Sequence, residues 1–306
     1  MARQAKIISA SRRTDIPAFY TPWFMNRIRE GYAVYPNPMF PGKTHSVDLT
    51  PEAVSGIVFW TRYPHPLMPF LTELDHRGYL YYFMVSLLDY PGHIEPRAPS
   101  PRRVVSLIHD LAAAIGPHRV FWRYDPVILG PMLSVDWHVD NFSRLARALS
   151  GAVEKVIVST VDAYHHTVDD MGGAAQGFRY DPREYMLVLE KLAAVAAREG
   201  LVMQSCAEPD VNITGIRPGR CVDATLMERL SGRKTSRQKH VQRKGCLCQK
   251  SVDIGVNNTC VFGCRYCYAT SSPEIALANY RRHDPEAPWI IRTPQFNQYR
   301  KFRQPS

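Results

Sequence analysis

The sequence predicts an α/β fold, a full or partial (β/α) barrel, from three observations. Strand-like runs alternate with amphipathic helical segments, which is typical of a parallel sheet. Polar or charged residues follow most of these runs, at the end where barrels gather their active sites. The 306 residues, 45% of them hydrophobic, suffice for one large domain or two modest ones. A doubly wound open sheet is the competing fold.

The expected elements follow from periodicity and composition. Seven short apolar runs, rich in β-branched and aromatic residues, are expected to be strands: Lys6–Ser11, Gly56–Thr61, Tyr79–Ser86, Arg119–Arg123, Lys155–Thr160, Gly200–Ser205 and Ser251–Val256. Helical spacing predicts segments at Pro51–Ser55, Arg102–Ile115, Asn141–Leu149 and Arg183–Glu199. Two Pro-rich stretches are expected to be loops over the sheet, Tyr35–Pro41 and Pro91–Pro101.

The polar side chains that follow the expected strands supply the candidate catalytic residues. They are Arg62, Arg123, Asp125 and Glu208. If the carboxyl ends of the strands converge, these side chains share one pocket. For any single one of them, a helix cap or a salt bridge is an equally good explanation.

The cysteines are distributed unevenly. The chain has seven, and none precedes Cys206. The first residues do not resemble a signal peptide and no stretch is apolar enough to span a membrane, so we expect a cytoplasmic protein with no membrane partner. An odd number of cysteines in such a protein favours metal or redox chemistry over a disulfide framework.

Three cysteines form a compact motif, Cys260-x3-Cys264-x2-Cys267. Three thiolates on one loop can bind three irons of a [4Fe–4S] cluster and leave the fourth iron open, whereas such clusters usually have four cysteine ligands. Structural zinc is the alternative, although zinc usually takes paired Cys-x2-Cys units and this loop has one.

The other cysteines are Cys206, Cys221, Cys246 and Cys248. Four thiolates match the ligand number of a closed second [4Fe–4S] cluster or of a zinc ion. Buried or redox-active thiols are the remaining interpretation.

The motif resembles the signature of the radical S-adenosylmethionine superfamily. Gly263 before the second cysteine and Tyr268-Ala269 after the third are most similar to the branch that contains spore photoproduct lyase. With Thr14–Pro17 and His283–Pro285, the whole chain also resembles a bacterial family known as a domain of unknown function. The superfamily resemblance implies a [4Fe–4S] cluster, S-adenosylmethionine on its open iron, and an electron donor such as ferredoxin or flavodoxin. It implies an enzyme that generates a 5′-deoxyadenosyl radical and acts on an unknown substrate.

One departure from the superfamily concerns the order of the chain. The cysteine motif normally follows the first barrel strand, but here it lies near the C-terminus. A circular permutation would reconcile the two, with Ser251–Val256 docking beside Lys6–Ser11. Residues 1–211 would then form the barrel core, and the Cys-rich, basic residues 212–306 would complete it. Otherwise the motif belongs to an appended ferredoxin-like module.

The resemblance also suggests which residues contact the cofactor. The candidates are Arg13, Asp15, Asp162 and Tyr266. The superfamily's usual Gly-Gly-Glu contact to the methionine amino group is absent, and Asp15 or Glu208 could replace it.

Two other functions remain open, and the first is suggested by charge. The net charge is +10, and residues 217–250 carry ten Lys and Arg residues against two acidic ones. This segment could bind phosphates in a nucleic-acid repair or modification protein, or could be a solvated loop beside an anionic cluster. Few aromatic residues lie among its basic ones, which weakens a single-strand binding groove. The third function is a non-catalytic iron–sulfur electron-transfer or sensor protein.

Overall fold

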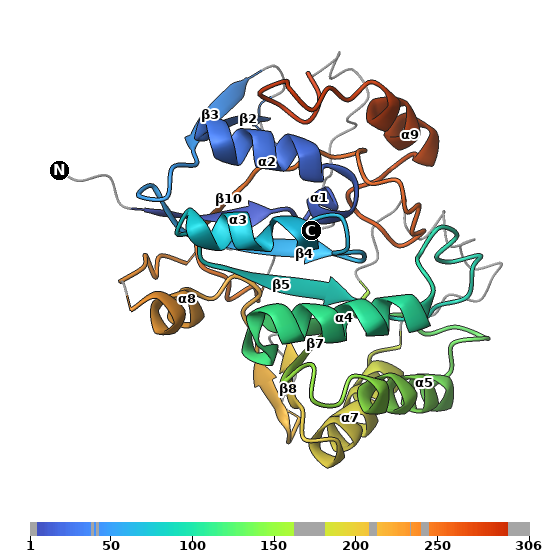
Figure 1. Ribbon diagram of the computed structural model, residues 1–306. Helices are drawn as coiled ribbons and strands as arrows, with labels where there is room; N and C mark the ends of the chain where they lie inside the picture. Colours follow the sequence, from blue (N-terminus) through green and yellow to red (C-terminus); the bar gives the residue numbers. More distant parts are fainter. Residues whose placement is uncertain are drawn as a thin grey trace.

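A computed structural model describes residues 5–37, 40, 43–161, 181–207, 213–232, 234–239 and 245–292. Its centre is an eight-stranded parallel sheet (Figure 1). From edge to edge the strands are β10 (Ser251–Asp253), β1 (Lys6–Ala10), β4 (Val54–Thr61), β5 (Tyr81–Ser86), β6 (Val120–Val127), β7 (Lys155–Thr160), β8 (Val202–Ser205) and β9 (Ile216–Pro218). The predicted alternation of strands and helices around a parallel sheet is therefore confirmed.

The strand nearest the C-terminus lies beside the first strand of the chain. Ile7 is in register with Ser251 and Ile8 with Val252, in parallel orientation. This is the pairing expected from the sequence, although regular strand structure ends at Asp253. Among the described residues the sheet has two free edges, β10 and β9, which do not pair with each other. The sheet is open, so the expectation of a full barrel is wrong.

Both faces of the sheet are buried, and successive side chains alternate between them. In β4, Ile57 and Phe59 belong to the larger hydrophobic core, whereas Val58 and Trp60 belong to a smaller one on the opposite face. The larger core includes residues of α2 (Thr21–Glu30), α3 (Leu71–His76), α4 (Pro101–Ile115), α5 (Val135–Ala148) and α7 (Pro182–Arg198). The smaller core contains residues of α8 (Ala224–Ser231) and three cysteines.

Two of the expected helices match closely and one begins earlier. α4 and α7 start at Pro101 and Pro182, where a proline is favourable because the first helical N–H has no partner. α5 starts six residues before the predicted Asn141, since Ser134 caps it by accepting a hydrogen bond from the Trp137 N–H at 3.1 Å. Polar residues that are buried on α5 obscure its amphipathic pattern.

Several elements differ from the expectation. Pro51–Ser55, predicted to be helical, is a turn leading into β4. β2 (Tyr32–Pro36) and β3 (Thr44–Asp48) form an antiparallel hairpin that was not predicted, and the predicted loop Tyr35–Pro41 overlaps only the last two residues of β2. The short helices α1 (Ile16–Phe19) and α9 (Pro273–Arg281) and two 3₁₀ turns, Met68–Phe70 and Pro117–Arg119, have no counterpart in the prediction.

Helix α2 escapes prediction because a charged residue occupies its buried side. Arg27 is fully buried and pairs with Glu30 at 2.8 Å, while it also donates to the Glu286 carbonyl at 3.0 Å. An arginine among apolar residues hides the helical spacing that would otherwise reveal the element.

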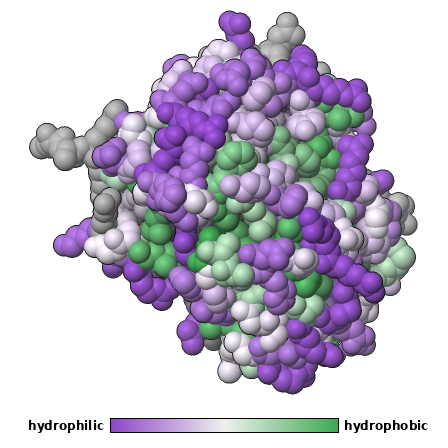
Figure 2. Space-filling view, viewed as in Figure 1, coloured by the Kyte–Doolittle hydropathy of each residue, from purple (hydrophilic) through white to green (hydrophobic). Residues whose placement is uncertain are grey.

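Over the face shown in Figure 2, hydrophilic residues cover most of the surface and hydrophobic residues gather near its middle. None of the helices in the described parts of the chain is long and apolar enough to cross a membrane.

Candidate functional site

A cavity of about 350 Å³ lies at the carboxyl ends of the strands. Its walls come from residues in or just after the carboxyl-terminal parts of β1, β4, β5, β6, β7 and β8, and from all seven cysteines. The polar strand ends thus converge as expected, in an open sheet. This convergence brings the two sets of cysteines, which are separated in sequence, to one cavity.

Six of the eight candidate side chains other than cysteine line this cavity. They are Arg13, Asp15, Arg62, Arg123, Asp125 and Tyr266. Asp162 and Glu208 lie outside the described residues. The structure places the six together, and their chemical roles stay predictions.

The triad loop, which we define as residues 256–269, carries Cys260, Cys264 and Cys267. Asn258 holds its two ends together, because its backbone N–H donates to the Ala269 carbonyl at 2.8 Å and its side chain accepts from the Ser271 N–H at 2.7 Å. Asn279 of α9 donates to the Asn258 carbonyl at 2.8 Å. The loop is therefore a closed unit, braced by the following helix.

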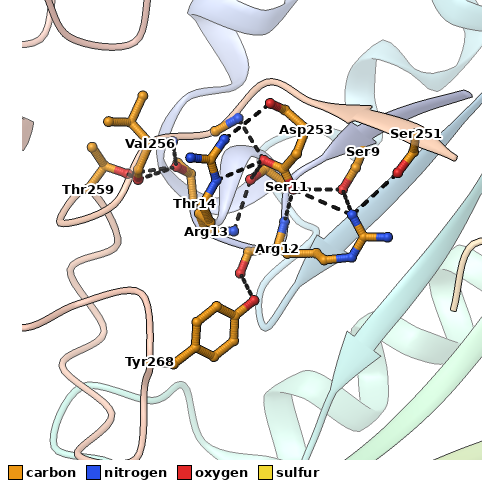
Figure 3. A network of polar contacts seen from close by, with 11 residues as sticks. Ser9, Ser11, Arg12, Arg13, Thr14, Ser251, Asp253, Val256, Thr259 and Tyr268 are labelled. Carbon is orange, nitrogen blue, oxygen red and sulfur yellow. Dashed lines mark hydrogen bonds and ion pairs between the residues drawn. The ribbon is translucent and has the colours of Figure 1, made fainter. Parts of the chain in front are cut away.

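The N-terminal segment also holds the triad loop. The Thr14 hydroxyl lies 2.7 Å from that of Thr259 and accepts a hydrogen bond from the Val256 N–H at 2.9 Å (Figure 3). Tyr20 donates to the Thr259 carbonyl at 2.7 Å. Residues almost 250 positions apart in sequence thus form one buried polar seam.

Asp253, at the end of β10, extends this polar seam with further contacts between β10 and the N-terminal segment. Its carboxylate accepts hydrogen bonds from Ser9 at 2.9 Å and Ser11 at 2.6 Å, and forms ion pairs with Arg12 and Arg13 (Figure 3). Burial alone would raise the pKa of Asp253, but the two arginines hold it below its usual value. Arg13, a candidate cofactor contact, is therefore engaged in fastening β10 to β1.

A buried ion pair secures the triad loop to a third region. Arg62 pairs with Glu95 and donates to the Tyr266 hydroxyl at 2.9 Å, while Tyr266 also donates to Glu95. Burial would lower the pKa of Arg62, but Glu95, Tyr266 and Cys264 raise it well above its usual value. Two predicted site residues thus meet around a carboxylate that the sequence analysis missed.

Glu95 lies in the Pro-rich stretch Pro91–Pro101, which forms a loop as expected. The Arg265 N–H donates to the Ile94 carbonyl at 3.0 Å, so this stretch also contacts the triad loop through its backbone. Glu95 is the only acidic residue between the predicted strand Tyr79–Ser86 and Pro101 other than Asp89. Its position after the end of a predicted strand is the feature by which the sequence could have identified Glu95 as a site residue.

Asp15 serves as a helix cap. Its carboxylate accepts hydrogen bonds from the Ala18 N–H at 3.1 Å, at the start of α1, and from the Arg62 N–H at 2.7 Å. Burial raises the pKa of Asp15 to about 7. Asp15 therefore ties the end of β1 to the end of β4, and its carboxylate is already engaged by backbone donors.

The strand ends of β5, β6 and β7 are joined by a second polar cluster. Arg123 pairs with Asp125 and donates to the Ser86 hydroxyl at 3.3 Å. Ser159 donates to Asp125 at 2.5 Å. Both predicted residues, Arg123 and Asp125, line the cavity and remain candidates for substrate contact.

The four remaining cysteines also meet. The Sγ atoms of Cys221 and Cys206 lie 3.2 Å apart. Cys248 lies within hydrogen-bond reach of both Cys221 and Cys246, and its Sγ accepts from the Val222 N–H at 3.5 Å. Contact with Cys206 raises the pKa of Cys221 well above its usual value. We call these four residues the thiol quartet.

The triad fits an iron–sulfur cluster by its donor chemistry. Burial raises the pKa of Cys264 to about 12 and that of Cys260 above its ordinary range, so both favour the neutral thiol, and a bound cation would be what stabilises their thiolate forms. None of the seven cysteines is in a disulfide. Within the described ranges, no group of three or more His, Cys, Asp or Glu side chains is arranged around a single metal ion. A cluster, in which each thiolate binds a different iron, does not require that arrangement.

One solved structure shows a weak likeness to the chain. The chain is 12% identical to a Bacteroides thetaiotaomicron protein named "putative phosphomethylpyrimidine kinase", with a TM-score of 0.25 over 68% of this chain and 65% of that one. The match spans less than two thirds of that protein, and at this TM-score it says nothing about fold or function. No curated protein matches the chain.

A family model covers nearly the whole chain. It matches residues 7–269, from β1 to the end of the triad loop, and so includes every strand of the sheet and all seven cysteines. This agrees with the resemblance noted from Thr14–Pro17, whereas His283–Pro285 lies beyond the matched residues. The chain belongs to the DUF1848 family, a domain of unknown function.

Proposed function

We propose that this protein is a radical S-adenosylmethionine enzyme whose substrate binds in the strand-end cavity. The observation that carries the proposal is the position of the Cys260-x3-Cys264-x2-Cys267 loop, which follows a strand beside β1 and lines the cavity together with the polar strand ends. When bound, a [4Fe–4S] cluster with S-adenosylmethionine supplies a 5′-deoxyadenosyl radical that abstracts a hydrogen atom from the substrate.

The parallel pairing of β10 with β1 supports a circularly permuted arrangement. In the superfamily that the motif resembles, the cysteines follow the first strand of the sheet. Here β10 occupies an edge position next to β1, and the remaining strands follow in chain order from β1 to β9. The order in space would then match the superfamily, while the order in the chain starts at the second strand.

The residues of the chain would hold the reactants and exclude water. Glu95 and Arg62 fix Tyr266 beside Cys264, and all three triad cysteines line the cavity. Arg123 and Asp125 present a charged pair from the neighbouring strand ends, suited to a polar substrate. Such placement aims one C–H bond of the substrate and shields the site from quenching.

The test is anaerobic reconstitution with iron and sulfide, followed by dithionite and S-adenosylmethionine. We expect 5′-deoxyadenosine to form without added substrate at a slow rate, and to be lost in Cys264→Ala. S-adenosylhomocysteine, which lacks the sulfonium methyl group, is the control and should give no product. A fully iron-loaded protein that forms no 5′-deoxyadenosine would refute the proposal and favour an electron carrier or sensor.

The described basic side chains of residues 217–250 do not line this cavity, although Cys221, Cys246 and Cys248 of the same segment do. These basic residues are exposed and absent from the cavity lining: Arg217, Arg220, Arg229, Lys234, Arg237, Lys239 and Lys250. Arg237 pairs with Glu228. Nucleic-acid binding stays a prediction from charge, which salt-dependent binding to DNA or RNA would test.

A further inference from the structure

The thiol quartet is assembled from three separate segments. Cys206 follows β8, Cys221 follows β9, and Cys246 and Cys248 precede β10. All four line the same cavity as the triad. Four thiols brought together from distant parts of a fold, without disulfides, are a ligand set for a metal centre.

The backbone around the thiol quartet is fixed by paired hydrogen bonds. Tyr82 of β5 is fully buried and donates to the Cys221 carbonyl at 2.6 Å, while its hydroxyl accepts from the Asp223 N–H at 3.1 Å. The Gln249 N–H donates to the Val222 carbonyl at 3.1 Å. The segments that carry Cys221 and Cys248 are therefore joined to each other and to the sheet, whereas their thiols, now in mutual contact, must turn apart to bind separate irons.

Two arginines lie near three of the four sulfurs. Arg12 and Arg123 each place a guanidinium over the Trp60 ring, at 5.0 and 4.9 Å from its centroid. Cys221 and Cys248 are within electrostatic reach of Arg12, and Cys221 and Cys206 within reach of Arg123.

Each of these arginines also has an unused donor. Nη2 of Arg12 and Nε of Arg123 are buried and have no hydrogen-bond partner among the described residues. Buried N–H groups of charged side chains are normally paired, because an unpaired one is costly. These two donors are available to an anionic group bound at the cavity.

We propose that Cys206, Cys221, Cys246 and Cys248 bind a second [4Fe–4S] cluster, closed by four cysteines and facing the same cavity as the triad. An oxidised cluster of this type with four thiolates carries a charge of about −2, and Arg12 and Arg123, which also pair with Asp253 and Asp125, supply positive charge near it. The single residue between Cys246 and Cys248 is shorter than the two to four residues typical of zinc ligand pairs. This inference does not depend on radical chemistry at the triad.

Iron and sulfide contents of anaerobically purified protein test the proposal. We expect about eight irons per chain in the wild type, and about four in the Cys260→Ser/Cys264→Ser/Cys267→Ser variant. The cluster left in that variant should show a [4Fe–4S] electron paramagnetic resonance signal that S-adenosylmethionine does not change. Zinc in place of the remaining iron, or no metal at all, would overturn the proposal.

The reciprocal variant, Cys221→Ser/Cys248→Ser, should keep about four irons and a signal that responds to S-adenosylmethionine. A full iron content in this variant would also overturn the proposal. If this variant does not fold, the triple variant decides the question, because its changes lie on the triad loop. Loss of 5′-deoxyadenosine formation alone, with both iron counts as expected, would refute the proposed function and leave the second cluster standing.

The reduction potential of the second cluster tests the role of the arginines. In the triple variant, Arg123→Gln should lower the reduction potential of the remaining cluster without changing its iron content, because a positive charge is removed from beside an anion. Arg103→Gln, exposed on α4, is the matched control and should cause no shift. An unchanged potential in Arg123→Gln would remove this arginine from the site.

Discussion

The two sets of cysteines are held in opposite ways. The triad lies on one short loop, its thiols are partly exposed, and polar bonds from Thr14 and Tyr20 hold it in place. The thiol quartet is gathered from three segments, and three of its members pack into the smaller hydrophobic core together with Met227. Those three thiols are buried.

The difference matters for what each site can do. A metal site that exchanges ligands keeps an open coordination position, whereas a permanent site is closed by protein ligands. The triad has three donors and a face toward the cavity, while the thiol quartet has four donors, most of them within the core. The first arrangement suits a site where a cofactor binds and leaves, and the second suits a fixed centre. Variants that disturb one set and spare the other test this contrast.

The largest effect is expected at Asp253, the hub of the polar seam. Asp253→Asn leaves Arg12 and Arg13 without their carboxylate, and breaking such a buried pair costs about 3–5 kcal/mol. We expect a lower free energy of unfolding in urea and loss of iron from the triad alone. Asp136→Asn is the control, because its pair with Lys191 is exposed and contributes about 0–1 kcal/mol. Equal destabilisation in the two variants would contradict the seam's role.

The same variant has a pH signature. An aspartate titrates near pH 3.9 in the unfolded chain, and in the fold burial would raise the pKa of Asp253 but Arg13 and Arg12 lower it. The unfolded state then binds more protons, so the stabilisation is complete above that pH and is lost as the pH falls toward the folded pKa. The difference between wild type and Asp253→Asn in free energy of unfolding should be constant above about pH 5 and shrink below about pH 4.

Much of the sheet could be predicted from the sequence, because each central strand is a short apolar run bounded by polar residues. The docking of Ser251–Val256 beside Lys6–Ser11 was also predicted, from the resemblance to a superfamily in which a strand precedes the cysteine loop. The hairpin β2–β3 and strand β9 were not. β2 ends in a proline and contains partly exposed residues, and β9 has three residues, too few for a periodic pattern.

The candidate site was predictable only in part, for a related reason. The triad is visible because its ligands are neighbours in sequence. The contact between Cys206 and Cys221, and the pairing of Arg62 with Glu95, depend on the folded chain and leave no local spacing to find. Asp15 was predicted to contact the cofactor because it follows a strand. In the structure helix α1 begins after it, and its carboxylate caps that helix.

The next largest effect is expected at Gly255, where β10 leads into the triad loop. A Cβ at this position would lie 1.9 Å from the Ser11 Oγ and 2.6 Å from its Cβ, so Gly255→Ala must displace the loop. Overpacking of this kind costs about 1–3 kcal/mol. The variant should lose iron from the triad and keep that of the thiol quartet. Gly92→Ala, whose Cβ would meet nothing within 4 Å, is the control. Loss of iron from both sets would show that they are not held independently.

An effect no larger than that of Gly255→Ala is expected at Tyr82, on the side of the thiol quartet. Tyr82→Phe leaves the Cys221 carbonyl and the Asp223 N–H buried without their partner, at a cost of about 1–3 kcal/mol. Tyr79→Phe removes a comparable hydrogen bond, to the Leu49 carbonyl, from the larger core. Both variants should unfold at similar urea concentrations, below that of the wild type. Only Tyr82→Phe should release iron from the thiol quartet, because only that hydroxyl positions a cysteine-bearing segment. Equal iron retention in the two variants would mean that the core alone, without this hydrogen bond, holds the four thiols together.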